Sequence, residues 1–220
     1  MANESTTGFG LRQAMRLGNT PAIGGQSKYK IKTALGVGIF KNNPVSLQDG
    51  SGDQGYVQDA SFSTTDDTGA GGVDYTTATE ALLIGVFNGA FYIDSTTKKP
   101  TFANSVAASQ AFGTNPNTGS TDGFAFVNDD PIQEYTVKAD AAVTQSMIGQ
   151  VGNINDFSAT DAKDGQSTAT LDVGSLAETK MFRVVRVAED PKNEDATAAG
   201  CNVIAVMNGA ANLFINGRDS

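Results

Sequence analysis

Hydrophobic and polar residues alternate along several short segments of the chain. Over 28–33, apolar or β-branched residues alternate with lysines, which predicts a strand with one face in solvent. The apolar run 81–91 is too hydrophobic for an exposed edge and predicts a buried strand. Many short strands separated by Gly, Pro, Asn and Asp predict an all-β fold, a sandwich or barrel with long polar loops. The further strands are expected at 45–47, 56–62, 124–127, 133–138, 168–171, 181–187 and 201–207.

The first 25 residues differ in composition from the rest of the chain. They are rich in glycine and poor in aliphatic residues, so a stable isolated helix is unfavourable there. We expect residues 1–25 to form an extended N-terminal arm that docks on another surface, with a disordered tail as the alternative. Residues 26–220 are expected to form a β-rich domain, as one unit or as two β subdomains, with one helical turn near 140–145.

The composition excludes several kinds of chemistry. The 220-residue chain contains no histidine and one cysteine, which excludes a His-based triad, a His-ligated zinc and an intrachain disulfide. Cys201 adjoins a hydrophobic run and is expected to be a small buried residue. The formal net charge of −9 lacks the basic footprint of a nucleic-acid binder. Because no apolar run is long enough for a membrane helix, we expect a soluble protein made in a cytoplasm, without nucleic-acid or membrane partners.

The acidic motifs favour turns over active sites. Segment 49–55 resembles a calcium-binding loop because side chains with oxygen atoms stand at alternate positions. However, Gln54 replaces the turn glycine of such a loop, and Ala60 replaces its closing glutamate. We expect a hairpin turn there, and calcium at a looser acidic loop stays open. The Asp-Asp pairs at 66–67 and 129–130 are also typical of turns, the second because proline follows it. We therefore assign no catalytic residue, no cofactor and no metal ligand, and expect the phenylalanines to serve core packing or a subunit contact.

An ordered series of short motifs resembles one family of proteins. Residues 7–12, TGFGLR, resemble the TGFGLRP opening of a family of tailed-phage virion proteins of the marine-phage and cyanophage type, with Gln13 in place of the proline. Residues 124–131, FAFVNDDP, resemble the AxVxDDP segment of that family. Further similar segments follow the family's order and extend the resemblance over nearly the whole chain, at 84–92, 99–102, 134–137, 166–172, 182–187 and 202–208.

The family that these motifs resemble consists of capsid decoration (cement) proteins, which lie on the outer head shell and brace neighbouring capsid subunits. The resemblance therefore implies a structural protein of the virion, without enzymatic activity, whose partner is the major capsid protein. We expect the β-domain to form a homo-oligomer at a capsid symmetry axis, a trimer or else a dimer.

The N-terminal arm is the expected contact with a neighbouring subunit. We expect segment 5–25 to lie on, or pair with, an adjacent subunit. Deletion of residues 1–20 is then expected to abolish attachment and to leave the domain folded. The alternative function is a tail or fibre component, or a host-surface-binding module, and a carboxylate-based glycosidase is a third. The residues expected to contact the capsid or neighbour are Phe9, Leu11, Arg12, Met15 and Arg16.

Overall fold

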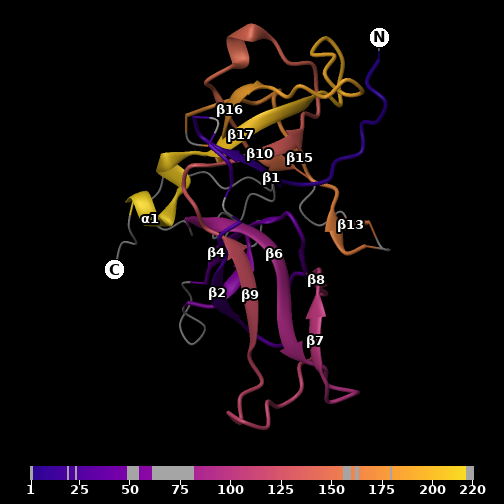
Figure 1. The fold of residues 1–220 in the computed structure, drawn as a ribbon, viewed down its shortest axis with the longest axis vertical. Coiled ribbons are helices and arrows are strands. Elements are labelled where there is room, and N and C mark those ends of the chain that lie inside the picture. Colours follow the sequence, from indigo (N-terminus) through magenta and orange to yellow (C-terminus); the bar gives the residue numbers. More distant parts are fainter. Residues whose placement is uncertain are drawn as a thin grey trace.

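The chain forms antiparallel β-sheets with little helix (Figure 1). The computed structural model describes residues 2–18, 20–22, 24–48, 55–60, 82–155, 160–161, 164–178 and 180–216. Its sheets confirm the predicted all-β fold.

The first sheet contains five antiparallel strands in the order β1-β10-β17-β16-β11. Every residue of the central strand β17 is buried, so the sheet is covered on both faces there. Tyr135 and Phe182 belong to its hydrophobic cluster and meet edge to face, with ring centroids 6.1 Å apart. The strands of this sheet are β1 (Arg12–Arg16), β10 (Gln133–Lys138), β11 (Val151–Gly152), β16 (Phe182–Val187) and β17 (Asn202–Met207).

The second sheet contains six strands in the order β2-β9-β6-β4-β5, and β7 pairs with β6. Successive side chains of a strand point to opposite faces. On β9, Ala125 and Val127 accordingly point into a second hydrophobic cluster, whereas Phe124 and Phe126 point away from it. The strands are β2 (Ser27–Ile31), β4 (Pro44–Leu47), β5 (Val57–Asp59), β6 (Leu83–Ile93), β7 (Pro100–Ala103) and β9 (Gly123–Asn128).

Short elements complete the described chain. Three two-stranded ladders pair β3 (Ile39–Phe40) with β8 (Ser105–Val106), β12 (Ile154–Asn155) with β15 (Thr170–Leu171), and β13 (Thr160–Asp161) with β14 (Gln166–Ser167). The helical turn expected at 140–145 begins only at the end of that range. The helical elements are the 3₁₀ turns η2 (Gln145–Met147) and η3 (Gly209–Ala211) and the short helix α1 (Leu213–Asn216).

The two large sheets form two lobes, one above the other in Figure 1. We call the part around the five-stranded sheet the upper lobe and the part around the six-stranded sheet the lower lobe. Strand β6 contributes to both cores: Leu83 and Val86 pack in the upper cluster, and Ile84 and Phe87 pack in the lower one. This strand therefore fixes the position of one lobe against the other.

Candidate functional site

The N-terminal arm lies on its own chain. The side-chain amide of Asn3 donates to three backbone oxygens in the loop 195–199. The ammonium group of Lys138, a residue that is only 2% exposed, donates to the Ser5 carbonyl at 2.9 Å, and burial lowers its pKa. Segment 5–25 was expected to lie on an adjacent subunit, and in this structure its first part instead covers the upper lobe of the same molecule.

Close packing explains the two glycines of the TGFGLR motif. Gly8 lies against the backbone carbonyls of Thr168 and Ala169, where a Cβ atom has no room. Gly10 has a φ angle of 70°, which favours glycine, and its N–H donates to the Ala169 carbonyl at 3.0 Å. The motif that carries the resemblance at the N-terminus thus has a structural role within this chain.

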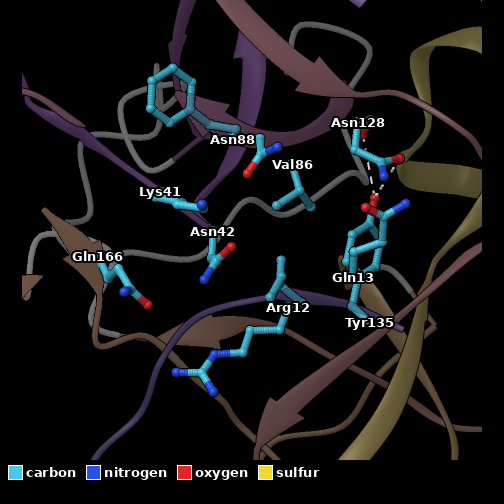
Figure 2. Close-up of a pocket in the computed structure, with 11 residues that line it drawn as sticks. Arg12, Gln13, Lys41, Asn42, Val86, Asn88, Asn128, Tyr135 and Gln166 are labelled. Atoms are coloured by element: carbon cyan, nitrogen blue, oxygen red, sulfur yellow. Dashed lines mark hydrogen bonds between the residues drawn. The ribbon is translucent and has the colours of Figure 1, made fainter. Parts of the chain in front are cut away.

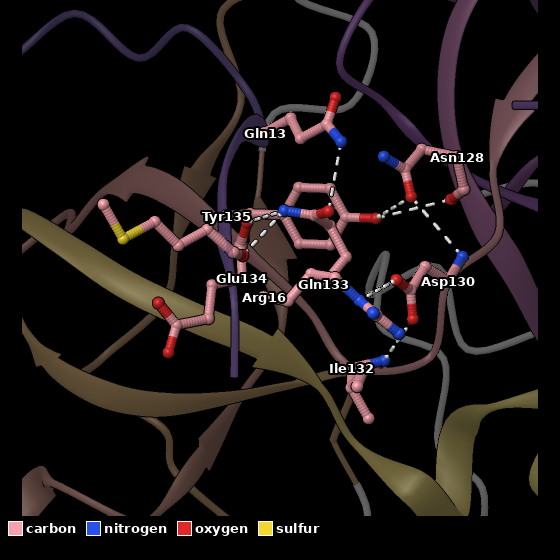
Figure 3. Close-up of polar contacts among 9 residues, drawn as sticks. Gln13, Arg16, Asn128, Asp130, Ile132, Gln133, Glu134 and Tyr135 are labelled. Carbon is pink, nitrogen blue, oxygen red and sulfur yellow. Dashed lines mark hydrogen bonds and ion pairs between the residues drawn. The ribbon is translucent and has the colours of Figure 1, made fainter. Parts of the chain in front are cut away.

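The predicted contact residues lie in different environments, and the structure contradicts the role given to one of them. Leu11 is 0% exposed in the upper core, so its side chain does not reach a neighbour. The ring of Phe9 is half-buried beneath the guanidinium group of Arg12, 4.1 Å from the ring centroid. Arg16 forms an ion pair with Asp130 at 2.7 Å (Figure 3), whereas Met15 is 47% exposed. Arg12 and Met15 therefore remain the most accessible of the five.

The expected result of deleting residues 1–20 changes for the same reason. The deletion removes Leu11 from the core and removes β1, which pairs with β10 along the edge of the five-stranded sheet. Gln133, which is 1% exposed, also loses the Met15 carbonyl to which its amide donates at 2.8 Å. We now expect this truncation to destabilise the upper lobe, so it does not separate attachment from folding.

Four phenylalanines, two of them exposed and two half-buried, lie next to one another on the outer side of the six-stranded sheet, and we call this surface the phenylalanine face: Phe91, Phe102, Phe124 and Phe126. The strand register places Phe102 and Phe124 directly opposite Phe91, one on each side. Phe102 is 74% exposed and Phe124 is 40% exposed. The ring centroids of Phe91 and Phe102 are 4.8 Å apart, and those of Phe102 and Phe126 are 6.3 Å apart. Contiguous exposed rings of this kind mark an interaction surface.

A row of lysines lies along one side of the phenylalanine face. On the edge strand β2, Lys28 lies opposite Phe126 and Lys30 lies opposite Phe124. The Lys28 ammonium is 5.9 Å from the centroid of the Phe126 ring, and Lys30 pairs with Asp122 at 3.5 Å. Asp122 neutralises Lys30, so the unpaired positive charge of this edge among the described residues is that of Lys28, in a chain whose net charge is −9. A partner with an apolar centre and an acidic rim is therefore complementary to the face.

A hollow of about 240 Å³ lies beside the rings of Phe102 and Phe126. A β-bulge between Phe87 and Gly89 interrupts the register of β6 and β9 at this point. The side chains of Asn88 and Asn104 line the same hollow and place amide groups at the edge of the aromatic surface. An apolar surface with a few polar groups at its edge can fix the orientation of a bound segment as well as its position.

Sequence patterning identified part of this face. The alternation over 124–127 predicted the strand that carries Phe124 and Phe126. Residue 102, in contrast, lies outside the predicted strands, because nothing in the local sequence indicates that β7 pairs with β6. The sequence signal for such a face is a strand in which two phenylalanines stand two positions apart with a small inward residue, such as Ala125, between them.

The aspartates at 129 and 130 have separate structural partners. Asp129 accepts a hydrogen bond from the Tyr29 hydroxyl at 2.7 Å, and burial together with this contact raises the pKa of Tyr29. Asp130 pairs with Arg16 and accepts the N–H of Ile132 at 3.1 Å. Each carboxylate therefore links the turn after β9 to another segment, as the turn prediction implies.

The structure describes only some of the other residues that the sequence offered as candidates for chemistry. Cys201 is 0% exposed, which confirms the prediction of a small buried residue, and burial raises the pKa of its thiol. Residues 49–54 of the calcium-like loop and the pair 66–67 lie outside the described residues. Within the described part of the chain, no group of three or more metal-ligating side chains comes together. In that same part, no helix has the length and hydrophobicity needed to span a bilayer.

Comparison of the chain with protein-family models, with curated protein sequences and with solved structures gives no match. The phenylalanine face is therefore interpreted from its own chemistry. It combines exposed rings, a cationic edge and amide groups on a β-framework, which suits the binding of another macromolecule.

Proposed function

We propose that this chain is a capsid decoration (cement) protein of a tailed phage, bound to the outer head shell, where it stabilises contacts between major capsid subunits. The observation that carries the proposal is the phenylalanine face, a large exposed apolar surface on a β-framework. The ordered series of motifs that resembles the decoration family supports the same function. The proposal places the protein in the virion, after synthesis in the host cytoplasm.

In this account the phenylalanine face docks on an apolar patch of the major capsid protein. Phe102 is the central anchor because it is the most exposed of the four rings and packs against both Phe91 and Phe126. The Lys28 and Lys30 side chains contact an acidic rim around that patch. A homo-oligomer, trimer or dimer, at a symmetry axis presents several such faces at once, and the repeated contacts add avidity across the shell.

The test measures binding of the purified chain to shells assembled from the major capsid protein alone, by cosedimentation at increasing protein concentration. The variant is Phe102→Ser. A phenylalanine side chain buries about 200 Å² at most, and 74% of Phe102 is exposed and available to a partner, so about 150 Å² is at stake. At about 25 cal/mol per Å² this corresponds to roughly 2–4 kcal/mol, or at least about 30-fold weaker binding.

Phe214→Ser is the matched control. Phe214 is also exposed, at 53%, but it belongs to α1 outside the phenylalanine face. We expect the control to bind as the unchanged chain does, and both variants to keep their stability because both rings face solvent. Equal binding by Phe102→Ser and Phe214→Ser would reject the face as the capsid contact. Binding to tails or to host cells in place of shells would favour the alternative function.

A further inference from the structure

A groove of about 310 Å³ lies at the junction of the two lobes (Figure 2). One wall is the start of β1, where Leu11, Arg12 and Gln13 line it. The opposite wall comes from the segment at Lys41 and from β6 around Val86. The groove is distinct from the phenylalanine face, although Asn88 lines both the groove and the hollow beside the rings.

The groove is cationic in an acidic protein. Arg12 and Lys41 line it, and no described residue that lines it carries a carboxylate. Neither Arg12 nor Lys41 forms an ion pair with any residue that the structure describes. In Figure 2 Lys41 and Gln166 lie on one side of the groove, whereas the Arg12 guanidinium, which covers the Phe9 ring, points away from them. An unneutralised lysine in a chain of net charge −9 favours an anionic ligand at the Lys41 side.

The other side of the groove is built from uncharged polar groups. Figure 2 shows Gln13, Asn128 and the hydroxyl of Tyr135 together there. Asn128 is 5% exposed, and its Nδ2 atom is buried without a hydrogen-bond partner among the described residues. An unpaired buried amide is costly, so a group that accepts its hydrogen bond is stabilised at this position.

Two further amides in the groove are uncommitted. The side chains of Asn88 and Gln166 make no hydrogen bond to any described residue. Each amide offers both donors and an acceptor. The groove therefore offers donors and acceptors together, beyond its two cations, which is the pattern that suits hydroxyl groups.

The backbone holds the groove in shape. Asn42 has a φ angle of 73°, a conformation that residues other than glycine seldom adopt. Its N–H donates to the Phe87 carbonyl, its carbonyl accepts the Leu11 N–H, and its amide donates to the Phe9 carbonyl. Asn42 thus ties the arm, the Lys41 segment and β6 together at the groove.

We propose that this groove binds a hydroxylated carboxylate of the size of a sugar acid. The carboxylate lies against Lys41, and the hydroxyl groups bond to the amides of Asn88, Gln166 and Asn128. The buried apolar groups of Leu11, Val86 and Phe87 form the floor. The same chemistry occurs in a free uronic acid and in a uronic acid within a glycan. This inference does not rest on the capsid function, because the Lys41 side of the groove is separate from the four rings of the phenylalanine face, although Asn88 lines both the groove and the hollow beside the rings.

The test is an NMR titration of the ¹⁵N-labelled full chain with galacturonate, with trigalacturonate as the glycan arm, and with neutral galactose as the ligand control. We expect galacturonate to bind with a dissociation constant of about 1 mM or tighter and to shift the side-chain amide signal of Asn128. Galactose, which lacks the carboxylate, is expected to bind at least about tenfold more weakly. Tighter binding of trigalacturonate identifies the glycan as the source, and equal or weaker binding identifies the free acid.

The variant Lys41→Gln removes one cation and leaves the fold intact, because Lys41 holds its place through backbone bonds to Gly165 and Ser167. We expect about tenfold weaker galacturonate binding by this variant. Lys99→Gln, in the exposed turn before β7, is the matched control and is expected to bind normally. The proposal is wrong if galacturonate does not bind, if galactose binds equally well, or if Lys41→Gln binds as tightly as Lys99→Gln. Binding of an acidic peptide alone would also overturn it and would assign the groove to a protein segment.

Discussion

Gly10 tests whether the arm packs on its own chain as the structure places it. A Cβ atom at Gly10 would lie 2.7 Å from the Asn42 carbonyl oxygen and 2.8 Å from the Cβ atoms of Asn42 and Ser167. Ordinary contacts between such atoms are about 3.5–4.0 Å, so Gly10→Ala has to displace the arm by roughly 1 Å. Gly18→Ala is the control in the same arm, because Gly18 also has a positive φ angle, 90°, but has no atom within 4 Å of its Cβ position.

The two variants share the conformational cost of alanine at positive φ, about 1–2 kcal/mol. Only Gly10→Ala also loses packing. Its displacement strains the bonds from the Gly10 N–H to Ala169 and from the Leu11 N–H to Asn42, at about 1 kcal/mol each. It also lifts the fully buried Leu11, which contributes about 2–3 kcal/mol.

We therefore expect Gly10→Ala to lower the free energy of unfolding by about 3–5 kcal/mol more than Gly18→Ala does. For a chain of this length, that difference lowers the melting temperature by roughly 6–20 °C. Urea unfolding followed by circular dichroism, with thermal melts in parallel, measures it. If the two variants differ by less than about 1 kcal/mol, the arm does not pack on its own chain in solution, and a contact with a neighbouring subunit regains support.

Two further predictions concern charged groups. Glu134 is 1% exposed and accepts hydrogen bonds from both terminal guanidinium nitrogens of Arg186, at 2.9 and 2.7 Å. Because Arg186→Met leaves this buried carboxylate unpaired, we expect it to lower the free energy of unfolding, measured in urea, by about 3 kcal/mol. Lys192→Met breaks the exposed pair with Glu4 and is expected to cost at most about 1 kcal/mol, and an equal cost for the two would contradict this ranking. The hydrogen bond from the Thr197 hydroxyl is the largest of the causes that lower the pKa of Asp195 to about 2 from its ordinary 3.8. The contribution of Asp195 to stability is therefore complete above pH 3.8 and is lost as the pH falls through about 2. Thr197→Val is expected to raise the pKa of Asp195 toward 3.8 in an NMR titration of the carboxyl carbon, and an unchanged pKa would refute the assignment of the hydroxyl as the cause.

The local sequence was sufficient to predict strands that have a regular alternation of apolar and polar residues or a continuous apolar run. Alternation over 28–33 and 124–127 and the apolar run at 81–91 correspond to β2, β9 and β6, with ends shifted by a few residues. Such strands are defined by side chains two positions apart, and that information is local. β7 was missed because its residues have a strand partner only in β6 and carry no regular alternation of their own.

The arm could not be placed from the sequence because its contacts are distant. Asn3 bonds to residues more than 190 positions away, and Lys138 reaches Ser5 across 133 positions. A glycine-rich segment with few apolar residues is equally compatible with a free tail, a partner contact or an intramolecular strap. The burial of Leu11 in the core of its own chain favours the intramolecular strap, and this burial is known only from the structure.

The groove could not be predicted from the sequence either, because its residues are also far apart along the chain. Its amides and cations come from five separate segments of the chain, and no local pattern in any of them indicates that these side chains meet. Only the junction of the two lobes brings them together. The left-handed backbone of Asn42, which lets this residue bond to the arm and to β6, is likewise seen only in the structure.

The most direct test of the capsid function is the copy number of this chain relative to the major capsid protein in purified phage particles, by quantitative mass spectrometry with labelled peptide standards. The account predicts a ratio near one, or a simple fraction that fills every symmetry axis of the shell. A few copies per particle would contradict decoration and place the protein in the tail or neck, and absence from the particle would remove the virion function altogether.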